Sequence, residues 1–192
     1  DMLKRDNDSR LNIYFLGNGT SDIVGVSPGD STQNASMLNI TGHFGMSWGP
    51  ELVSWYENSF IIAECHYALG NEGQALLKLN ETLEGIEQNW RSRGFSDASI
   101  PRYANISGED LLAAIMNEKY KALFLNMQSW SDWRRTEYPR FVDSDGNSTE
   151  CGASDGGIGI PRRLLYPDKE KSSNPKCPQN DGIYDRVEND PN

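Results

Sequence analysis

Apolar residues recur every three to four positions after Ser107, a rhythm typical of a helix with one apolar face. The apolar positions are Leu111, Leu112, Ile115, Met116, Leu123, Phe124 and Met127. Ser107 is a good N-cap residue, and Glu109 and Asp110 place negative charge in the first turn, where it suits the helix dipole. Asp110 also stands at the capping-box position. The pattern predicts a helix from near Gly108 to about Gln128, about 30 Å long.

A cluster of tryptophan, arginine and proline follows this helix. Its members are Trp130, Trp133, Arg134, Arg135, Tyr138 and Pro139. A residue that precedes proline avoids the helical region, so a second, shorter helix should end before Pro139. The cluster either binds a ligand by stacking and hydrogen bonding, or packs and caps the preceding helix. We favour the structural role, and we extend it to Arg162 and Arg163, which should pair with carboxylates.

Residues 51–92 carry two further helical patterns with a break at Gly70. The apolar positions are Leu52, Trp55, Tyr56, Phe60, Ile61 or Ile62, Ala63, Tyr67 and Leu69 in the first, and Ala75, Leu76, Leu79, Leu83 and Ile86 in the second. Gly70 is a C-cap candidate, and residues 71–73 form a tight turn. The pattern predicts an antiparallel helical hairpin with tetratricopeptide-like spacing. One such repeat cannot bury both of its faces, so we expect further neighbours.

Residues 1–50 are rich in glycine, asparagine, serine and aspartate, and one alternating run at 11–16 predicts a short strand. Residues 42–50 combine three glycines and a proline with the aromatic side chains of His43, Phe44 and Trp48. Such rings are either anchors into the core or a ligand platform. Because loops on a rigid scaffold concentrate binding residues, we take these three as candidate ligand-binding residues, with Trp48 first.

The last part of the chain predicts a small β-hairpin, with extended runs at 140–142 and 158–165 around a polar loop at 143–157. One helical turn should follow from Asp168, and the tail from Lys176 is polar. The segment DSDGNSTE in the loop offers oxygen ligands, but its glycine stands at position 4, whereas an EF-hand needs it at position 6. We interpret it as a polar turn and predict no metal site.

Composition excludes some classes of function. The net charge of -10 argues against a nucleic-acid partner, and no apolar run approaches the roughly 20 residues that cross a bilayer. Hydrophobic residues make up only 36%, and mean hydropathy is -0.66, so the chain carries long polar loops or belongs to something larger. We expect Cys65 to be a buried thiol and Cys151 and Cys177 to form a disulfide.

Catalysis has little support. The chain has only two histidines and no recognisable nucleophile motif. Acidic residues are so frequent that a pair of catalytic carboxylates is not ruled out by counting alone. We therefore predict that the chain is not an enzyme, has no catalytic residues and needs no cofactor.

Two separated motifs, NEKYKALFLNMQSWSDWRRTEYPRF and GIGIPRRLLYPDKEKSSNP, resemble the carboxy-terminal part of the SusD/RagB family of outer-membrane nutrient-binding lipoproteins of Bacteroidetes. The matching positions are Glu118, Lys119, Tyr120, Trp130, Arg134, Arg135, Pro139, Ile160, Pro161, Arg162, Arg163, Leu164, Tyr166, Pro167, Glu170, Asn174 and Pro175. Asp8, Arg10 and Leu11 are similar to the family's Asp-Pro-Arg-Leu element, with Ser9 in place of the proline.

The resemblance implies a mainly α fold: a tetratricopeptide-like hairpin and a long amphipathic helix, with extensive ordered loops and a small β-hairpin. Residues 1–192 would form the carboxy-terminal part of one SusD-like domain. Its segments would be a loop-rich stretch (1–50), the helical hairpin (51–92), the central helix with the Trp-Arg turn (107–137), and the β-hairpin with the tail (138–192).

The resemblance also implies a cell-surface subunit that binds a glycan or oligosaccharide and works with a TonB-dependent SusC-type outer-membrane transporter. An amino-terminal lipid outside this chain would anchor it to the outer membrane. Three alternatives stay open. The chain is a scaffold that docks on the transporter while the ligand is held elsewhere, or its ligand is a peptide, or it is a secreted hydrolase.

Overall fold

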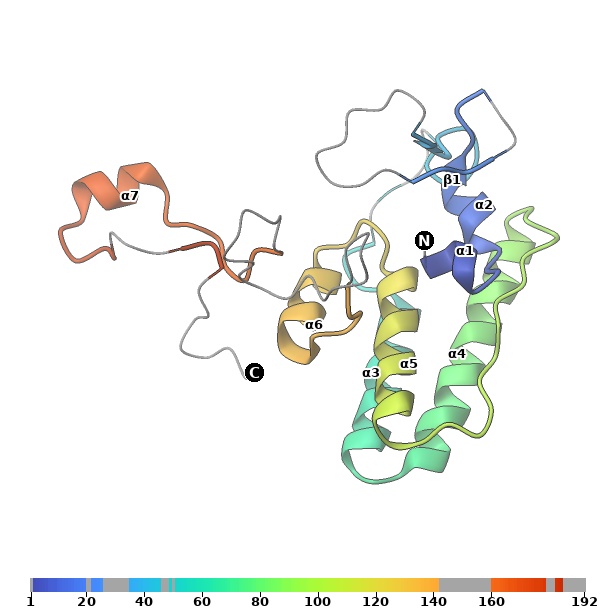
Figure 1. Ribbon diagram of the computed structural model, residues 1–192. Helices are drawn as coiled ribbons and strands as arrows, with labels where there is room; N and C mark the ends of the chain where they lie inside the picture. The colour runs from blue at the N-terminus through green and yellow to red at the C-terminus, as the bar shows by residue number, and fades with distance from the viewer. Residues whose placement is uncertain are drawn as a thin grey trace. The chain divides into compact units, whose positions relative to one another are not determined.

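The computed structural model describes residues 2–19, 22–25, 35–45, 49, 51–141, 160–178 and 182–184 (Figure 1). The described part is mainly helical, with one two-stranded antiparallel sheet, so the predicted fold class is confirmed. The elements are α1 (Met2–Arg5), α2 (Arg10–Tyr14), β1 (Phe15–Leu16), β2 (Met37–Leu38), α3 (Trp55–Ala68), α4 (Glu72–Ser92), α5 (Gly108–Ala122), α6 (Gln128–Thr136) and α7 (Asp168–Ser173). The chain forms two compact units, Asp1–Asn126 and Met127–Asn192, described in turn below.

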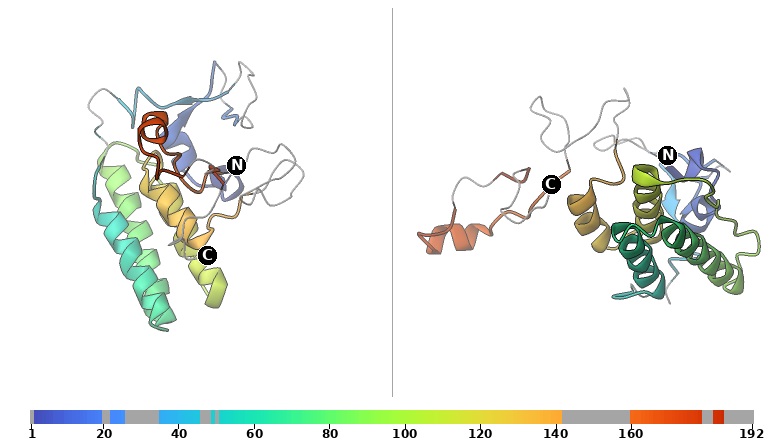
Figure 2. Two further views of the ribbon diagram at one scale, coloured as in Figure 1. Left: turned by 90° about the vertical axis from the view of Figure 1, so that its left-hand side faces the viewer. Right: turned by 90° about the horizontal axis from the view of Figure 1, so that it is seen from below.

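Helices α3 and α4 form the predicted hairpin, and α5 packs beside them (Figures 1 and 2). The buried apolar side chains that join them are Phe60, Ala63, Ala75, Leu79, Leu83, Ile86, Leu111, Ala114, Ile115 and Met116. Gly70 has a φ of +75°, in keeping with its predicted place after the end of α3. The hydroxyl of Ser54 accepts a hydrogen bond from the Glu57 amide, so α3 begins at Trp55. Leu52 and Val53 precede this cap and are exposed.

The central helix is shorter than predicted. It begins at Gly108, as expected, but ends at Ala122, and α6 starts separately at Gln128. Between them Leu125 has a φ of 64°, a left-handed conformation that cannot continue a helix. The capping box is also wrong, because the Ser107 side chain makes no cap hydrogen bond. Instead, the Gly108 amide donates to a carboxylate oxygen of Glu72 at 3.2 Å, which joins the starts of α4 and α5.

The strand predicted at 11–16 is correct only for its last two residues. Phe15 pairs with Leu38 and Leu16 with Met37 in the antiparallel sheet, whereas α2 occupies the preceding positions. Arg10, Ile13 and Tyr14 are buried, and this i, i+3, i+4 spacing is helical rather than alternating. The helical face therefore begins at Arg10, one residue before the run from which a strand was predicted.

The second unit contains α6 and α7. Helix α6 ends before Pro139 as predicted, with Glu137 in a left-handed conformation (φ 59°) after its last turn. Helix α7 confirms the helical turn expected from Asp168. The loop of the β-hairpin expected around 143–157 lies outside the described residues, and residues 160–165, its second expected extended run, form no strand, so that part of the prediction is wrong. The candidate calcium loop and Cys151 also lie within 143–157, so the disulfide stays a prediction.

Two further results concern the cysteines and the membrane. Cys65 is exposed on α3, so the expectation of a buried thiol is wrong: the α3 positions that face the core are Phe60 and Ala63. None of the helices in the described residues has the length and apolar character needed to span a bilayer.

Candidate functional site

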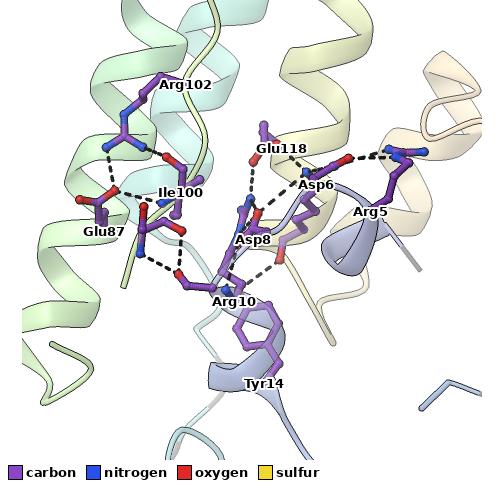
Figure 3. A network of polar contacts seen from close by, with 12 residues as sticks. Arg5, Asp6, Asp8, Arg10, Tyr14, Glu87, Ile100, Arg102 and Glu118 are labelled. Atoms are coloured by element: carbon purple, nitrogen blue, oxygen red, sulfur yellow. Dashed lines mark hydrogen bonds and ion pairs between the residues drawn. The ribbon is translucent and has the colours of Figure 1, made fainter. Parts of the chain in front are cut away.

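A buried cluster of charged side chains holds the amino-terminal segment against α5 (Figure 3). The Arg10 guanidinium donates from Nε to both carboxylate oxygens of Asp8, at 2.9 and 3.0 Å, and it also forms an ion pair with Glu118. Lys121 donates to Glu118 at 2.7 Å and to Asp6 at 2.8 Å. Charges of opposite sign thus alternate from α2 to α5, which allows them to be buried together.

Tyr103 completes this cluster by donating its hydroxyl hydrogen to Glu118 at 2.8 Å. Burial opposes ionisation of Glu118, but the charges of Arg10 and Lys121 outweigh burial and hold the pKa of Glu118 below its ordinary value. Burial, together with the Glu118 charge, raises the pKa of Tyr103. The cluster therefore keeps Glu118 ionised. It also fixes the position of α2 and hence of Tyr14, the last residue of α2.

Tyr14 is the centre of an aromatic cluster, which also includes Phe15, His43, Phe44, Trp90, Phe95 and Phe124. The Tyr14 ring stacks on Phe124 with centroids 5.1 Å apart and meets the edge of Trp90 at 5.9 Å. Its hydroxyl donates to the Lys121 carbonyl at 3.2 Å. Tyr14 and Trp90 are buried, whereas the other rings are partly exposed. We call the two buried rings the floor and the partly exposed rings the rim.

His43 and Phe44, two of the three candidate ligand residues, lie in this rim. The His43 ring is 4.3 Å from Phe44 and 4.4 Å from Trp90, which it meets edge to face. Phe44 also lies 5.9 Å from Phe124. Both candidates are therefore anchored to the core while keeping part of their surface exposed. The third candidate, Trp48, lies outside the described residues, and the ligand role of all three stays a prediction.

The electrostatics of His43 follow from this packing. Burial first, and then the positive charge of Arg93, lower the pKa of His43 from 6.5 to about 4. The imidazole is consequently neutral at pH 7 and packs as the seventh aromatic side chain of the cluster, beside six Phe, Tyr and Trp rings.

Acidification from pH 6.5 to 4.5 should therefore destabilise the first unit. In this window unfolded His43 takes up a proton that folded His43 does not, so the free energy of unfolding falls as the pH falls. We expect a loss of about 1 kcal/mol, since solvent screens this partly exposed ring. Glu118, whose pKa is lowered, contributes its own loss only below its ordinary value of 4.5.

Urea unfolding of the full chain at several pH values measures this loss. His43→Phe should flatten the dependence between pH 6.5 and 4.5, whereas the matched change His66→Phe, at the other histidine, should preserve it. An unchanged slope in His43→Phe would contradict the assignment.

The sequence patterns did not single out Tyr14, Trp90 or Phe124 as parts of one site. Trp90 ends the apolar pattern of α4, and Phe124 follows α5, so each has a local explanation as core. Tyr14 lies within the run interpreted as a strand. Only the packing of α2 against α4 and the end of α5 brings these rings together.

In the second unit, the Trp-Arg cluster has the structural role that we favoured. The Trp130 indole donates to the Pro161 carbonyl at 2.6 Å, and the Arg134 guanidinium lies over the Trp130 ring. Arg162 is buried, lies 5.0 Å from the centre of the Trp133 ring and donates to the Arg134 carbonyl and to Glu137. The two sequence motifs thus bind each other, and Arg162 caps the end of α6.

These features define a mainly helical protein with a tetratricopeptide-like hairpin and a cluster of aromatic side chains between α2, α4 and the end of α5. The chain belongs to the SusD-like family, described as starch-binding and associating with the outer membrane, whose model matches residues 1–167. No curated protein and no solved structure matches the chain. The family description is one of binding and not of catalysis.

Proposed function

We propose that this chain is part of a cell-surface glycan-binding subunit that works with a TonB-dependent SusC-type transporter in the outer membrane. The observation that carries the proposal is the family match over residues 1–167, since the family is described as starch-binding. An amino-terminal lipid outside this chain would anchor the protein at the cell surface.

The aromatic rim supports a carbohydrate ligand. Partly exposed rings such as Phe44 and Phe124 offer flat apolar faces, on which the C–H faces of a sugar ring can stack. The neutral state of His43 adds a polar edge without adding charge. The acidic chain, with a net charge of -10, favours a neutral ligand over a polyanion. We assign His43, Phe44 and Trp48 to ligand contact.

A scaffold role is the second candidate function, and the outer face of α3 favours it. Side chains there are apolar and exposed, namely Trp55, Ile61, Ile62, Cys65 and Leu69. Helix α3 thus has exposed apolar side chains besides its buried face at Phe60 and Ala63, and contiguous exposed apolar surface of this kind is often a site of protein contact. In this role the chain would contribute contacts to the transporter or to another helical pair, and the ligand would be held elsewhere.

Calorimetric titration of the full-length protein separates these roles. The panel contains starch oligosaccharides, other oligosaccharides and peptides, and a pull-down with the co-expressed transporter is done in parallel. Glycan binding together with transporter capture supports the proposal. Transporter capture without any glycan binding favours the scaffold role. Binding of peptides but of no glycan would show that the ligand is a peptide and not a carbohydrate.

Replacing Trp48 by alanine should weaken glycan binding by at least about 1 kcal/mol, the scale of a lost aromatic contact, because an indole offers a large stacking face. Transporter capture should be unchanged. Trp55→Ala, at an exposed tryptophan of α3, is the matched control and should leave glycan affinity unchanged. If Trp48→Ala binds the glycan as tightly as the wild type, Trp48 is not a ligand contact.

A further inference from the structure

One asparagine, Asn39, holds the turn that carries the rim residues His43 and Phe44. Its side chain is almost fully buried, with 6% of the residue exposed. The amide nitrogen donates to the Ile13 carbonyl at 3.1 Å. The amide oxygen accepts from the Gly42 amide at 2.8 Å and from the Thr41 hydroxyl at 3.3 Å. One end of the side chain therefore binds α2, and the other end binds the turn.

The backbone of Asn39 makes the same connection. Its N–H donates to the Tyr14 carbonyl at 2.8 Å, and its carbonyl accepts from the Phe44 amide at 2.8 Å. Tyr14 belongs to the floor of the aromatic cluster and Phe44 to the rim. The Asn39 residue is thus hydrogen-bonded to both layers of the cluster, through its backbone and its side chain together.

Gly42 gives independent support for this arrangement. A Cβ atom added to Gly42 would lie 2.7 Å from the Asn39 amide nitrogen and 2.8 Å from its oxygen, closer than real Cβ contacts. The backbone at Gly42 does not need a glycine for its φ angle, since it lies outside the left-handed region. Glycine is required there because the Asn39 amide lies against the turn.

We propose that Asn39 is a positioning residue of the ligand site: it holds residues 41–44 so that the rings of His43 and Phe44 lie on the floor formed by Tyr14 and Trp90. The ligand role of this rim rests on the proposed function. The positioning itself does not, because it can be measured without any ligand.

The first measurement is an NMR titration of His43 in the full-length protein, assigned by its loss in His43→Gln. Packing lowers the pKa of His43 to about 4, and the charged group that acts on it is Arg93. In Asn39→Ala the turn should separate from the floor, and the pKa should move upward by about 1 unit or more toward its ordinary value.

A matched control separates positioning from a general loss of stability. Asn80 also uses its amide to bind a backbone, donating to the Tyr103 carbonyl at 2.9 Å and accepting from the Tyr103 amide at 3.0 Å. Asn80→Ala should lower the melting temperature to a similar degree, yet leave the His43 titration as in the wild type. A wild-type titration in folded Asn39→Ala, or an equal shift in Asn80→Ala, overturns the proposal.

Gly42→Ala tests the contact between the turn and Asn39 directly. The new methyl group should displace the Asn39 amide and shift the His43 titration in the same direction. In the double variant with Asn39→Ala, the side-chain amide that the new methyl group would meet is absent. Gly42→Ala should therefore add almost no further shift to the His43 titration. Fully additive shifts would mean that Gly42→Ala acts by another route, and they would contradict the proposed contact.

The ligand measurement uses maltoheptaose as the probe. Asn39→Ala should raise its Kd at least about fivefold, and Asn80→Ala should leave it unchanged. If the wild type binds no oligosaccharide, the proposed glycan function fails, while the His43 titration still decides the positioning of the turn. If the His43 titration shifts but the Kd does not, the rim is not the binding site and the proposed role of Asn39 in ligand binding is wrong.

Discussion

Replacing Arg10 by methionine should lower the free energy of unfolding by about 3 to 5 kcal/mol, the scale for one partner lost from a buried ion cluster. Arg10 is completely buried, and its guanidinium binds Asp8 and Glu118. Methionine has a similar length but no charge, so two carboxylates would remain in the interior with only Lys121 near both of them. Denaturant unfolding of the full-length protein at pH 7 measures the loss.

Two controls separate burial of charge from loss of packing. Arg5→Met removes the exposed partner of Asp6 and should cost less than about 1 kcal/mol. The triple variant Asp8→Asn, Arg10→Met, Glu118→Gln neutralises the carboxylates as well and should be more stable than Arg10→Met alone. If Arg10→Met costs no more than Arg5→Met, the cluster does not hold α2 against α5.

The pH dependence of this loss has a definite sign. The pKa of Glu118 is lowered in the folded protein, so its contribution to stability is present above pH 4.5 and is lost as the pH falls below that value. Without Arg10, protonation of Glu118 would relieve an uncompensated charge. The difference in stability between the wild type and Arg10→Met should therefore become smaller on acidification below pH 4.5.

Replacing Trp133 by alanine should destabilise the second unit by about 3 to 5 kcal/mol, the scale for truncating a buried tryptophan. Only 5% of Trp133 is exposed, and its ring lies under the guanidinium of Arg162. Loss of the ring would leave a cavity and would also remove one of the contacts that hold Arg162 at the end of α6. Hydrogen exchange of the α6 amides, measured in the full-length protein, should increase accordingly.

Glycan affinity of the folded Trp133→Ala protein should be unchanged, because the ring supports structure and is not assigned to ligand contact. Trp133→Phe keeps an aromatic ring under Arg162 and should cost less than the alanine variant. Leu164→Ala, at an exposed side chain of the same unit, should change stability by less than about 0.5 kcal/mol. Loss of glycan binding without faster exchange in α6 would make the Trp-Arg cluster a ligand site.

The first unit shows how far local patterns determine a fold. The hairpin of α3 and α4 follows from apolar spacing and from Gly70, because each helix turns one face to the other and the connection is a few residues long. In the second unit, the end of α6 before Pro139 follows from the backbone preference of the residue that precedes a proline. In each of these cases the signal lies within a few positions of the structure that it predicts.

The amino-terminal segment shows where such patterns fail. Alternation within residues 11–16 predicted a strand, and the buried side chains of Asp8 and Arg10 lie outside that run. The partner that makes burial of Arg10 favourable is Glu118, 108 positions further along the chain. Once this ion pair forms, Arg10, Ile13 and Tyr14 share one helical face toward the core. Asp8, two positions away, supplies one compensating carboxylate, but the second, Glu118, is not visible from the sequence neighbours of Arg10.

For the candidate site, too, some features follow from the sequence and others only from the tertiary structure. The sequence by itself determined that His43, Phe44 and Trp48 form an unusual aromatic group on a glycine-rich segment, that the chain is mainly helical, and that its motifs are those of the SusD-like family. Only the tertiary structure decided that His43 and Phe44 rest on Tyr14 and Trp90, and that Asn39 holds their turn. The physical reason is that ring packing and buried hydrogen bonds join α2, the turn at 41–44 and α4, and residue spacing along the chain does not encode the distances between them.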